Sequence, residues 1–146
     1  MPAPSVSIQV RDWDGARLEA RRIRELVFVH EQAVPLELEM DEQDPRCDHA
    51  LAYTTDGLAV GTGRLLPDGH IGRMAVLKEW RGKGVGGRLL LALEEHARSR
   101  GHATLRLNAQ THAAGFYRRF GFDVEGPEFI EAGIPHVAMR RDLKIS

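Results

Sequence analysis

A glycine-rich stretch with two cations, WRGKGVGG over residues 80–87, is the part of the sequence best suited to bind phosphate. Glycines leave the backbone N–H groups uncovered, and a helix-like run follows at once, so the N–H groups of a helix N-terminus can face an anion. Arg81 and Lys83 add positive charge. A plain turn needs only one or two glycines, so their number favours a phosphate-binding loop.

Three phosphate-binding patterns compete for this stretch. Gly82, Gly84 and Gly87 match the G-x-G-x-x-G pattern of dinucleotide sites. Such a site needs a βαβ unit and an acidic residue about 20 positions further on, whereas a predicted meander precedes these glycines and the next predicted strand ends in Asn108. A nucleoside-triphosphate loop needs Lys and Ser/Thr after its last glycine, and arginine and leucine stand there. The third pattern, R-x-x-G-x-G over residues 81–86, binds pyrophosphate at a helix N-terminus and fits the context.

The elements before the loop follow from periodicity and turn chemistry. Residues 6–10 alternate like a strand, and apolar residues then recur at helical spacing. They predict a long first helix with Asp12 or Asp14 as its N-cap and a stop at residues 34–35. The acidic, proline-broken residues 36–48 predict a loop, in which a helical turn can occur.

Hairpin signals organise the rest of the chain. Asp-Gly pairs at residues 56–57 and 68–69 separate three apolar segments, which predicts an antiparallel meander over residues 49–77. A helix follows the glycines and closes at Gly101. The remaining predictions are a strand at 103–109, a short helix with Thr111 as N-cap and Gly121 as its end, and strands at 122–125 and 136–143.

Composition excludes several classes of protein. The 146 residues are 42% hydrophobic and 28% charged, which predicts a single globular domain over residues 1–146. A net charge of −1 with scattered basic residues argues against nucleic acid or an anionic membrane as a partner. No apolar run can span a bilayer and no signal peptide is apparent, so we expect a cytoplasmic protein. Cys47 is the only cysteine, and no Cys/His cluster has metal-ligand spacing.

Several motifs in this order resemble the GNAT superfamily of acetyl-coenzyme A-dependent N-acetyltransferases. They are MAVLKEWRGKGVGGRLL, LNAQTHAAGFYRRFGF, the preceding meander and the strand after GIPH. RELVFVHEQAVP and EFIEAGIPHVAM resemble more narrowly the small bacterial ElaA-like branch. The resemblance implies an α/β (α+β type) fold with a mixed, mostly antiparallel sheet flanked by helices, and a splayed strand pair that holds the coenzyme. It also implies acetyl transfer from acetyl-CoA to an amine by direct attack in a ternary complex, without a metal.

The resemblance assigns coenzyme contacts position by position. The strand before the loop offers backbone groups to the pantetheine arm, so side-chain identity matters little there. The loop amides hold the pyrophosphate, and Asn108 faces the pantetheine. The implied residues are Met74, Ala75, Val76, Arg81, Gly82, Lys83, Gly84, Val85, Gly86 and Asn108.

Catalysis needs an acid and a base. Tyr117 matches the family tyrosine near the coenzyme sulfur, and a phenol with a pKa near 10 can protonate a departing thiolate. Some related branches carry Glu at the position of Asn108, but an amide cannot act as a base. Glu31, at the end of the first helix, is the favoured base, and the other candidates are His70, His112 and His136.

The acceptor is left open by the sequence. Acidic residues 37–44 can attract a cationic amine such as a polyamine, an aminoglycoside or a lysine side chain, or they can be solvated surface. Cys47 has no sequence neighbour to activate it, which argues against a covalent intermediate. A coenzyme A-binding sensor without catalysis is the alternative function, and a nicotinamide enzyme lacks its ribose-binding acid. A homodimer is the common default for a small enzyme.

Overall fold

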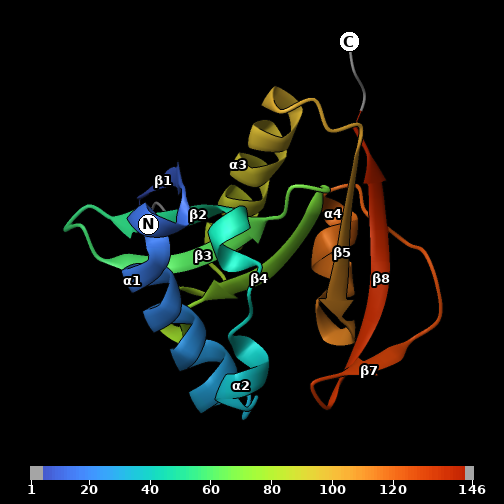
Figure 1. The fold of residues 1–146 in the computed structure, drawn as a ribbon, viewed down its shortest axis with the longest axis horizontal. Coiled ribbons are helices and arrows are strands. Elements are labelled where there is room, and N and C mark those ends of the chain that lie inside the picture. Colours follow the sequence, from blue (N-terminus) through green and yellow to red (C-terminus); the bar gives the residue numbers. More distant parts are fainter. Residues whose placement is uncertain (1–4, 144–146) are drawn as a thin grey trace.

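A mixed sheet forms the centre of the computed structural model, which describes residues 5–143 (Figure 1). Its strand order is β1-β2-β3-β4-β5-β8-β6, and β7 pairs with β8. The β4–β5 pair is parallel and the other described pairs are antiparallel, which confirms the predicted fold class. The strands are β1 (Val6–Arg11), β2 (Asp48–Thr54), β3 (Ala59–Leu65), β4 (His70–Val76), β5 (Thr104–Gln110), β6 (Asp123–Val124), β7 (Phe129–Glu131) and β8 (Ile134–Asp142).

Helices cover both faces of the sheet. The α-helices are α1 (Trp13–Arg24), α2 (Leu36–Glu39), α3 (Val85–Ser99) and α4 (Ala114–Arg119). Leu51 packs in the α1 cluster, whereas its neighbours Ala50 and Ala52 pack in the α3 cluster. Because successive side chains of a strand point to opposite faces, α1 and α3 lie on opposite sides of the sheet. No helix in the described range is long and apolar enough to cross a membrane.

The first helix changes its geometry partway along. Asp12 is the N-cap and accepts a hydrogen bond from the Gly15 N–H at 2.9 Å, which confirms one of the two predicted caps. After Arg24 the chain continues as a π-helix, η1 (Glu25–Glu31). The Gln32 N–H, for example, donates to the Val27 carbonyl five residues earlier at 3.0 Å. Single π turns are frequent at functional sites, and this one ends at Glu31.

Strands β4 and β5 meet at one end and diverge toward the other (Figure 1). Their ladder holds only two pairs, His70 with Arg106 and Ile71 with Leu107. Arg73 has a φ of +50°, and the register between β3 and β4 shifts at this place. A bulge of this kind bends its strand and interrupts pairing. The β5-facing edge of β4 therefore has no described strand partner beyond residue 71.

Three local features differ from the sequence prediction. Thr111 is not a helix cap, because it begins the 3₁₀ turn η4 (Thr111–Ala113), and Ala113 precedes α4 without a side-chain cap. The sequence did not predict strand β7, since the strand is only three residues long and holds two apolar residues, Phe129 and Ile130. The acidic stretch contains the one helical turn that the sequence allowed for, α2, and in addition a 3₁₀ turn, η2 (Asp44–Arg46).

Candidate active site

A cleft of ≈ 790 Å³ opens between the end of β4, the glycine loop and the first turns of α3 and α4. We call it the α3–α4 cleft. It brings together most of the residues predicted to bind coenzyme, with aromatic and basic side chains of α4 opposite them. Its lining comprises Met74, Ala75, Val76, Trp80, Arg81, Gly82, Gly84, Val85, Gly86, Gly87, Arg88, Leu91, Ala113, Phe116, Tyr117, Arg119 and Phe120.

The glycine loop presents bare backbone to this cleft. Gly84 is the N-cap of α3 with a φ of +84°, a conformation that favours glycine, and no side chain caps the helix. A Cβ built on Gly82 or Gly84 would meet no atom within 4 Å. The first N–H groups of α3 have no acceptor within their own helix, so the loop and the helix N-terminus can hold an anion such as a pyrophosphate.

Two further glycines let α4 approach the start of α3. A Cβ on Gly87 would lie 2.7 Å from Cζ of Phe120, and one on Gly86 would lie 3.4 Å from Cζ of Phe116. The aromatic rings thus occupy the volume that larger side chains would need. The two glycines thus allow close packing of these rings on the start of α3.

Arg81 is held by two partners away from the loop amides. Its Nε donates to the Val76 carbonyl at 2.9 Å, and its two terminal nitrogens bind the Glu31 carboxylate at 2.5 and 2.8 Å. The Arg81 hydrogen bond lowers the pKa of Glu31 and outweighs its burial, and the same contact raises the pKa of Arg81. The pair ties the end of η1 to the end of β4. Lys83 is exposed on the loop and is not among the lining residues.

Tyr117 lies where α4 faces the cleft. Its ring packs edge-on against Phe116 and Phe122, with centroid distances of 5.0 and 6.0 Å. Burial raises the pKa of the phenol to about 12, so it is protonated at neutral pH. Within residues 5–143 its hydroxyl has no hydrogen-bond partner. It is therefore free to donate to a molecule in the cleft.

The other predicted polar residues lie outside the cleft lining. Asn108 is exposed on β5, opposite Ala138 of β8. His70 opens β4 beside Asp68, and His112 is exposed on η4. His136 is buried, and its Nδ1 contacts the Ile134 carbonyl at 2.7 Å.

Cys47 is buried in the segment between η2 and β2. Its thiol donates to the Gln43 carbonyl at 3.1 Å. Burial raises its pKa to about 11, so the reactive thiolate is scarce at neutral pH. Both observations suit a structural residue.

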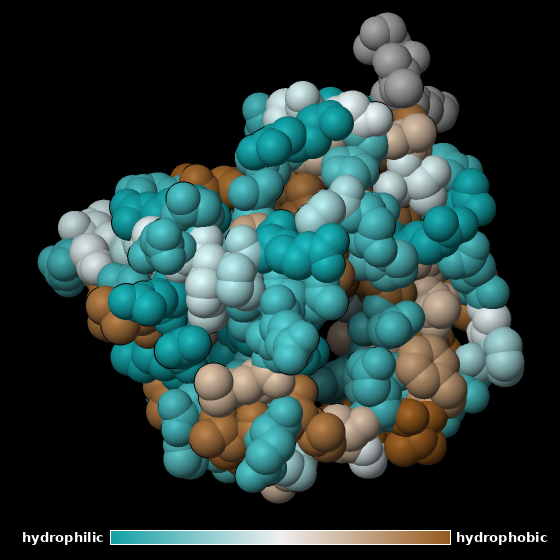
Figure 2. All heavy atoms as spheres, viewed as in Figure 1, coloured by the Kyte–Doolittle hydropathy of each residue, from teal (hydrophilic) through white to brown (hydrophobic). Residues whose placement is uncertain are grey.

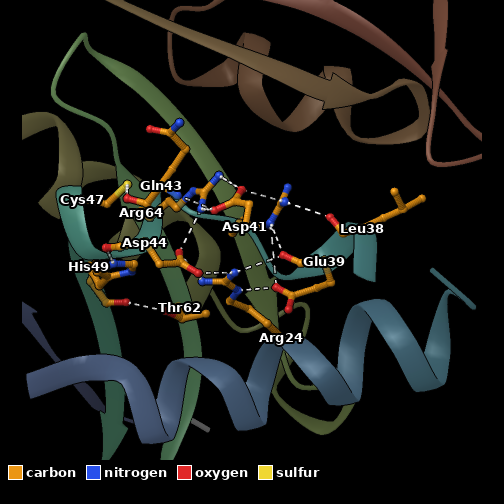
Figure 3. Close-up of polar contacts among 12 residues, drawn as sticks. Arg24, Leu38, Glu39, Asp41, Gln43, Asp44, Cys47, His49, Thr62 and Arg64 are labelled. Atoms are coloured by element: carbon orange, nitrogen blue, oxygen red, sulfur yellow. Dashed lines mark hydrogen bonds and ion pairs between the residues drawn. The ribbon is translucent and has the colours of Figure 1, made fainter. Parts of the chain in front are cut away.

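An arginine–carboxylate cluster anchors the bulge of β4 (Figure 3). Arg24 of α1 binds Glu39 at 2.5 Å and Asp44 at 2.8 Å. Asp41 accepts hydrogen bonds at 2.8 Å from Arg64 of β3 and at 3.1 Å from Arg73 of the bulge. The cluster consists of Arg24, Glu39, Asp41, Asp44, Arg64 and Arg73.

The pKa of Asp41 reflects these contacts. Burial opposes its ionisation, but the hydrogen bond and charge of Arg64 and the charge of Arg73 outweigh burial and lower the pKa to about 2. Three of the acidic residues in stretch 37–44, for which the sequence left open attraction of a cationic amine or a solvated surface, are paired with arginines: Glu39, Asp41 and Asp44.

A further hollow lies on the face of the molecule that carries α1 and α2 (Figure 2). Figure 2 shows a hollow on this face between α2 and β5, with apolar side chains gathered over α2 and near β7. Gln32, at the end of η1, and Gln110, at the end of β5, exchange side-chain hydrogen bonds of 2.9 and 3.4 Å. The exposed large apolar residues of α2, of its C-cap and of β7 are Leu36, Leu38, Met40 and Ile130.

Several residues of the site were missed by sequence reasoning. Arg119, Phe116 and Phe120 line the α3–α4 cleft beside Tyr117. The spacing in GFYRRF could have indicated the two phenylalanines, because it places them four residues apart on one side of a short helix. Arg73 had no signal, because its role depends on a bulge and on distant carboxylates.

The comparison with known proteins extends over the same region. The profile of the Acetyltransferase (GNAT) domain family matches residues 18–143, which include the whole lining of the α3–α4 cleft. The chain is 43% identical over 128 residues to the uncharacterized N-acetyltransferase YjcF of Bacillus subtilis, with 85% of this chain and 91% of YjcF covered.

Solved structures agree with this similarity. An acyl-CoA N-acyltransferase from Pseudomonas aeruginosa has a TM-score of 0.83 at 30% identity, with 94% of this chain and 99% of that chain covered. Escherichia coli ElaA has a TM-score of 0.83 at 28% identity, with 94% and 100% covered. The fold is shared along nearly the full length of both.

Proposed function

The chain belongs to the GNAT acetyltransferase family, which uses acyl-CoA cosubstrates, and from this premise we propose that it transfers an acetyl group from acetyl-CoA to an amine. The observation that carries the proposal is the meeting of three features in the α3–α4 cleft. They are the uncapped N-terminus of α3, the unpaired edge of β4 and the phenol of Tyr117. Together they match the phosphate, amide and thioester parts of one ligand.

The residues present fit the coenzyme. Loop amides between Arg81 and Gly86 suit the pyrophosphate, because glycine backbone and a helix N-terminus leave N–H groups for its oxygens. The unpaired backbone at Met74, Ala75 and Val76 suits the amides of the pantetheine, which would add to the sheet edge like a further strand. Arg81 lines this region but is held by Glu31, so the amides rather than its guanidinium carry most of the binding.

Two side chains would move protons during transfer. The acceptor nitrogen forms a bond to the thioester carbonyl carbon as the C–S bond breaks. Tyr117 gives its proton to the departing sulfur, since its pKa of about 12 keeps it protonated until then. Glu31 remains the proposed base for the proton that the amine loses. Its lowered pKa keeps it ionised, and it must part from Arg81 to act.

The acceptor would enter from the face of α1 and α2, opposite α3. Gln32 and Gln110 lie at that approach as hydrogen-bonding groups, and the exposed apolar residues of α2 and β7 flank it. Because the arginine–carboxylate cluster neutralises three acidic residues there, charge alone gives a polycation little attraction. Amines that carry an apolar group suit this approach better than polyamines.

Binding and turnover test the proposal together. Thermal melting with acetyl-CoA and with NAD separates the two coenzyme classes, since a ligand selective for the native state raises the melting temperature. We expect a rise with acetyl-CoA and none with NAD, and the reverse contradicts the proposal. A panel of amines with acetyl-CoA, followed by release of free thiol, then tests catalysis. Binding without thiol release for any amine favours the alternative, a coenzyme A-binding sensor.

A further inference from the structure

Three arginines line the α3–α4 cleft, and they differ in what holds them. Arg81 is bound to Glu31 and to the Val76 carbonyl. Arg88 donates to the Val6 carbonyl. Arg119 is exposed and has no ion-pair or hydrogen-bond partner within residues 5–143. Of the three, Arg119 is thus the one whose guanidinium is uncommitted in the described chain.

The position of Arg119 follows from the packing of α4 on α3. Its neighbour Phe120 fills the space beside Gly87, where a Cβ would lie 2.7 Å from the ring. Leu91 lines the same cleft and is 50% exposed. It stands four residues further along α3, about 6 Å beyond Gly87 at the helical rise of 1.5 Å per residue. Arg119 therefore lies next to a residue that packs on the first turn of α3, and it lines the same cleft as the glycine loop and Leu91.

We propose that Arg119 binds the 3′-phosphate of the coenzyme and makes the protein select coenzyme A over 3′-dephospho-coenzyme A. The inference rests on the proposed function. With the pantetheine along β4 and the pyrophosphate on the loop amides, the adenosine end extends past the loop toward Leu91, Phe120 and Arg119. The loop amides suit the pyrophosphate only, so the additional phosphomonoester needs a separate cation. A guanidinium can pair with two oxygens of such a group.

The test is a binding titration with two ligands and two variants. Coenzyme A and 3′-dephospho-coenzyme A differ only in the 3′-phosphate, so calorimetry with both measures the contribution of that group. We expect the unaltered chain to bind coenzyme A about tenfold more tightly, as for one charge-assisted contact. Arg119→Gln should lower the affinity for coenzyme A to that of the dephospho form and leave the latter unchanged.

Arg118→Gln is the matched control. Arg118 is an exposed arginine on the same helix that does not line the cleft, so this variant should keep the tenfold preference. Equal binding of both ligands to the unaltered chain overturns the inference, and so does a preference that survives Arg119→Gln. Equal loss in both variants also overturns it, because a diffuse positive field would then explain the preference. If neither ligand binds, the proposed function fails as well. Melting without ligand verifies that both variants fold.

Discussion

Replacing Asp41 by asparagine removes one negative charge from the arginine–carboxylate cluster and keeps the size of the side chain. Asp41 is 28% exposed and accepts hydrogen bonds from Arg64 and Arg73. The pKa of Asp41 falls from the ordinary 3.8 to about 2, and a pKa difference of 1 corresponds to about 1.4 kcal/mol. Its ionised form therefore stabilises the folded chain by about 2 kcal/mol at pH 7.

The sign of this effect sets its pH dependence. Because the pKa of Asp41 is lower in the folded chain than in the unfolded one, the stabilisation is fully present above about pH 5 and is lost as the pH falls toward 2. The difference in unfolding free energy between the unaltered chain and Asp41→Asn should be about 2 kcal/mol at pH 7. At pH 3 it should be roughly half as large.

Urea unfolding at pH 7, 5 and 3, followed by far-UV circular dichroism, measures this difference. Glu42→Gln is the control, because Glu42 is the adjacent exposed carboxylate and has no ion pair within residues 5–143. It should change the free energy of unfolding by less than about 0.5 kcal/mol. A loss for Asp41→Asn that is equal at all three pH values, or no larger than that of the control, refutes the assignment of the low pKa to Arg64 and Arg73.

Three substitutions test the site, and a labelling experiment tests the burial of Cys47. Tyr117→Phe should lower kcat by on the order of 10², because it removes the proposed proton donor. The melting temperature should change little, because the hydroxyl has no partner in the described chain. Steady-state kinetics and thermal melting measure the two effects, and an unchanged kcat would remove Tyr117 from the mechanism. Gly84→Val should abolish the acetyl-CoA melting shift, since φ is +84° and the side chain would enter the phosphate space, whereas Gly126→Val, at another open position, should keep it. Glu31→Gln should lower kcat by a similar factor in the same kinetics if it is the base, and an unchanged kcat limits it to holding its arginine. Cys47 should react with a thiol reagent only after unfolding, and rapid labelling of the native chain would contradict its burial.

Local patterns determined most of the secondary structure from the sequence alone. The Asp-Gly hairpins delimit β2, β3 and β4 as predicted, and Gly57 and Gly69 have the positive φ that such turns require. The helix after the glycine loop extends from Val85 to Ser99, with Gly101 at a φ of +82° just past its end. These features depend on residues near one another in the chain, so periodicity and turn chemistry are sufficient to predict them.

The loop could also be assigned to phosphate from sequence, because backbone N–H groups at a helix N-terminus need no distant partner. The individual glycines could not be distinguished in this way. Gly84 is required by its φ, whereas Gly87 is required by the ring of Phe120, which lies 33 positions away. From the sequence alone, a glycine in an open loop cannot be distinguished from a glycine at a close contact between helices.

Only the tertiary structure determined which charged side chains form ion pairs. Glu31 meets Arg81 across 50 positions, and Asp41 meets Arg64 and Arg73 across 23 and 32. Arg119, with an equally ordinary sequence environment, has no partner in the described chain. The physical reason is that an ion pair forms where the packing of helices and strands brings side chains within a few ångströms, and this distance depends on the whole fold. The sequence could therefore identify the loop that suits the coenzyme. The lowered pKa of Glu31, and whether each arginine already has a carboxylate partner, could be read only from the folded structure.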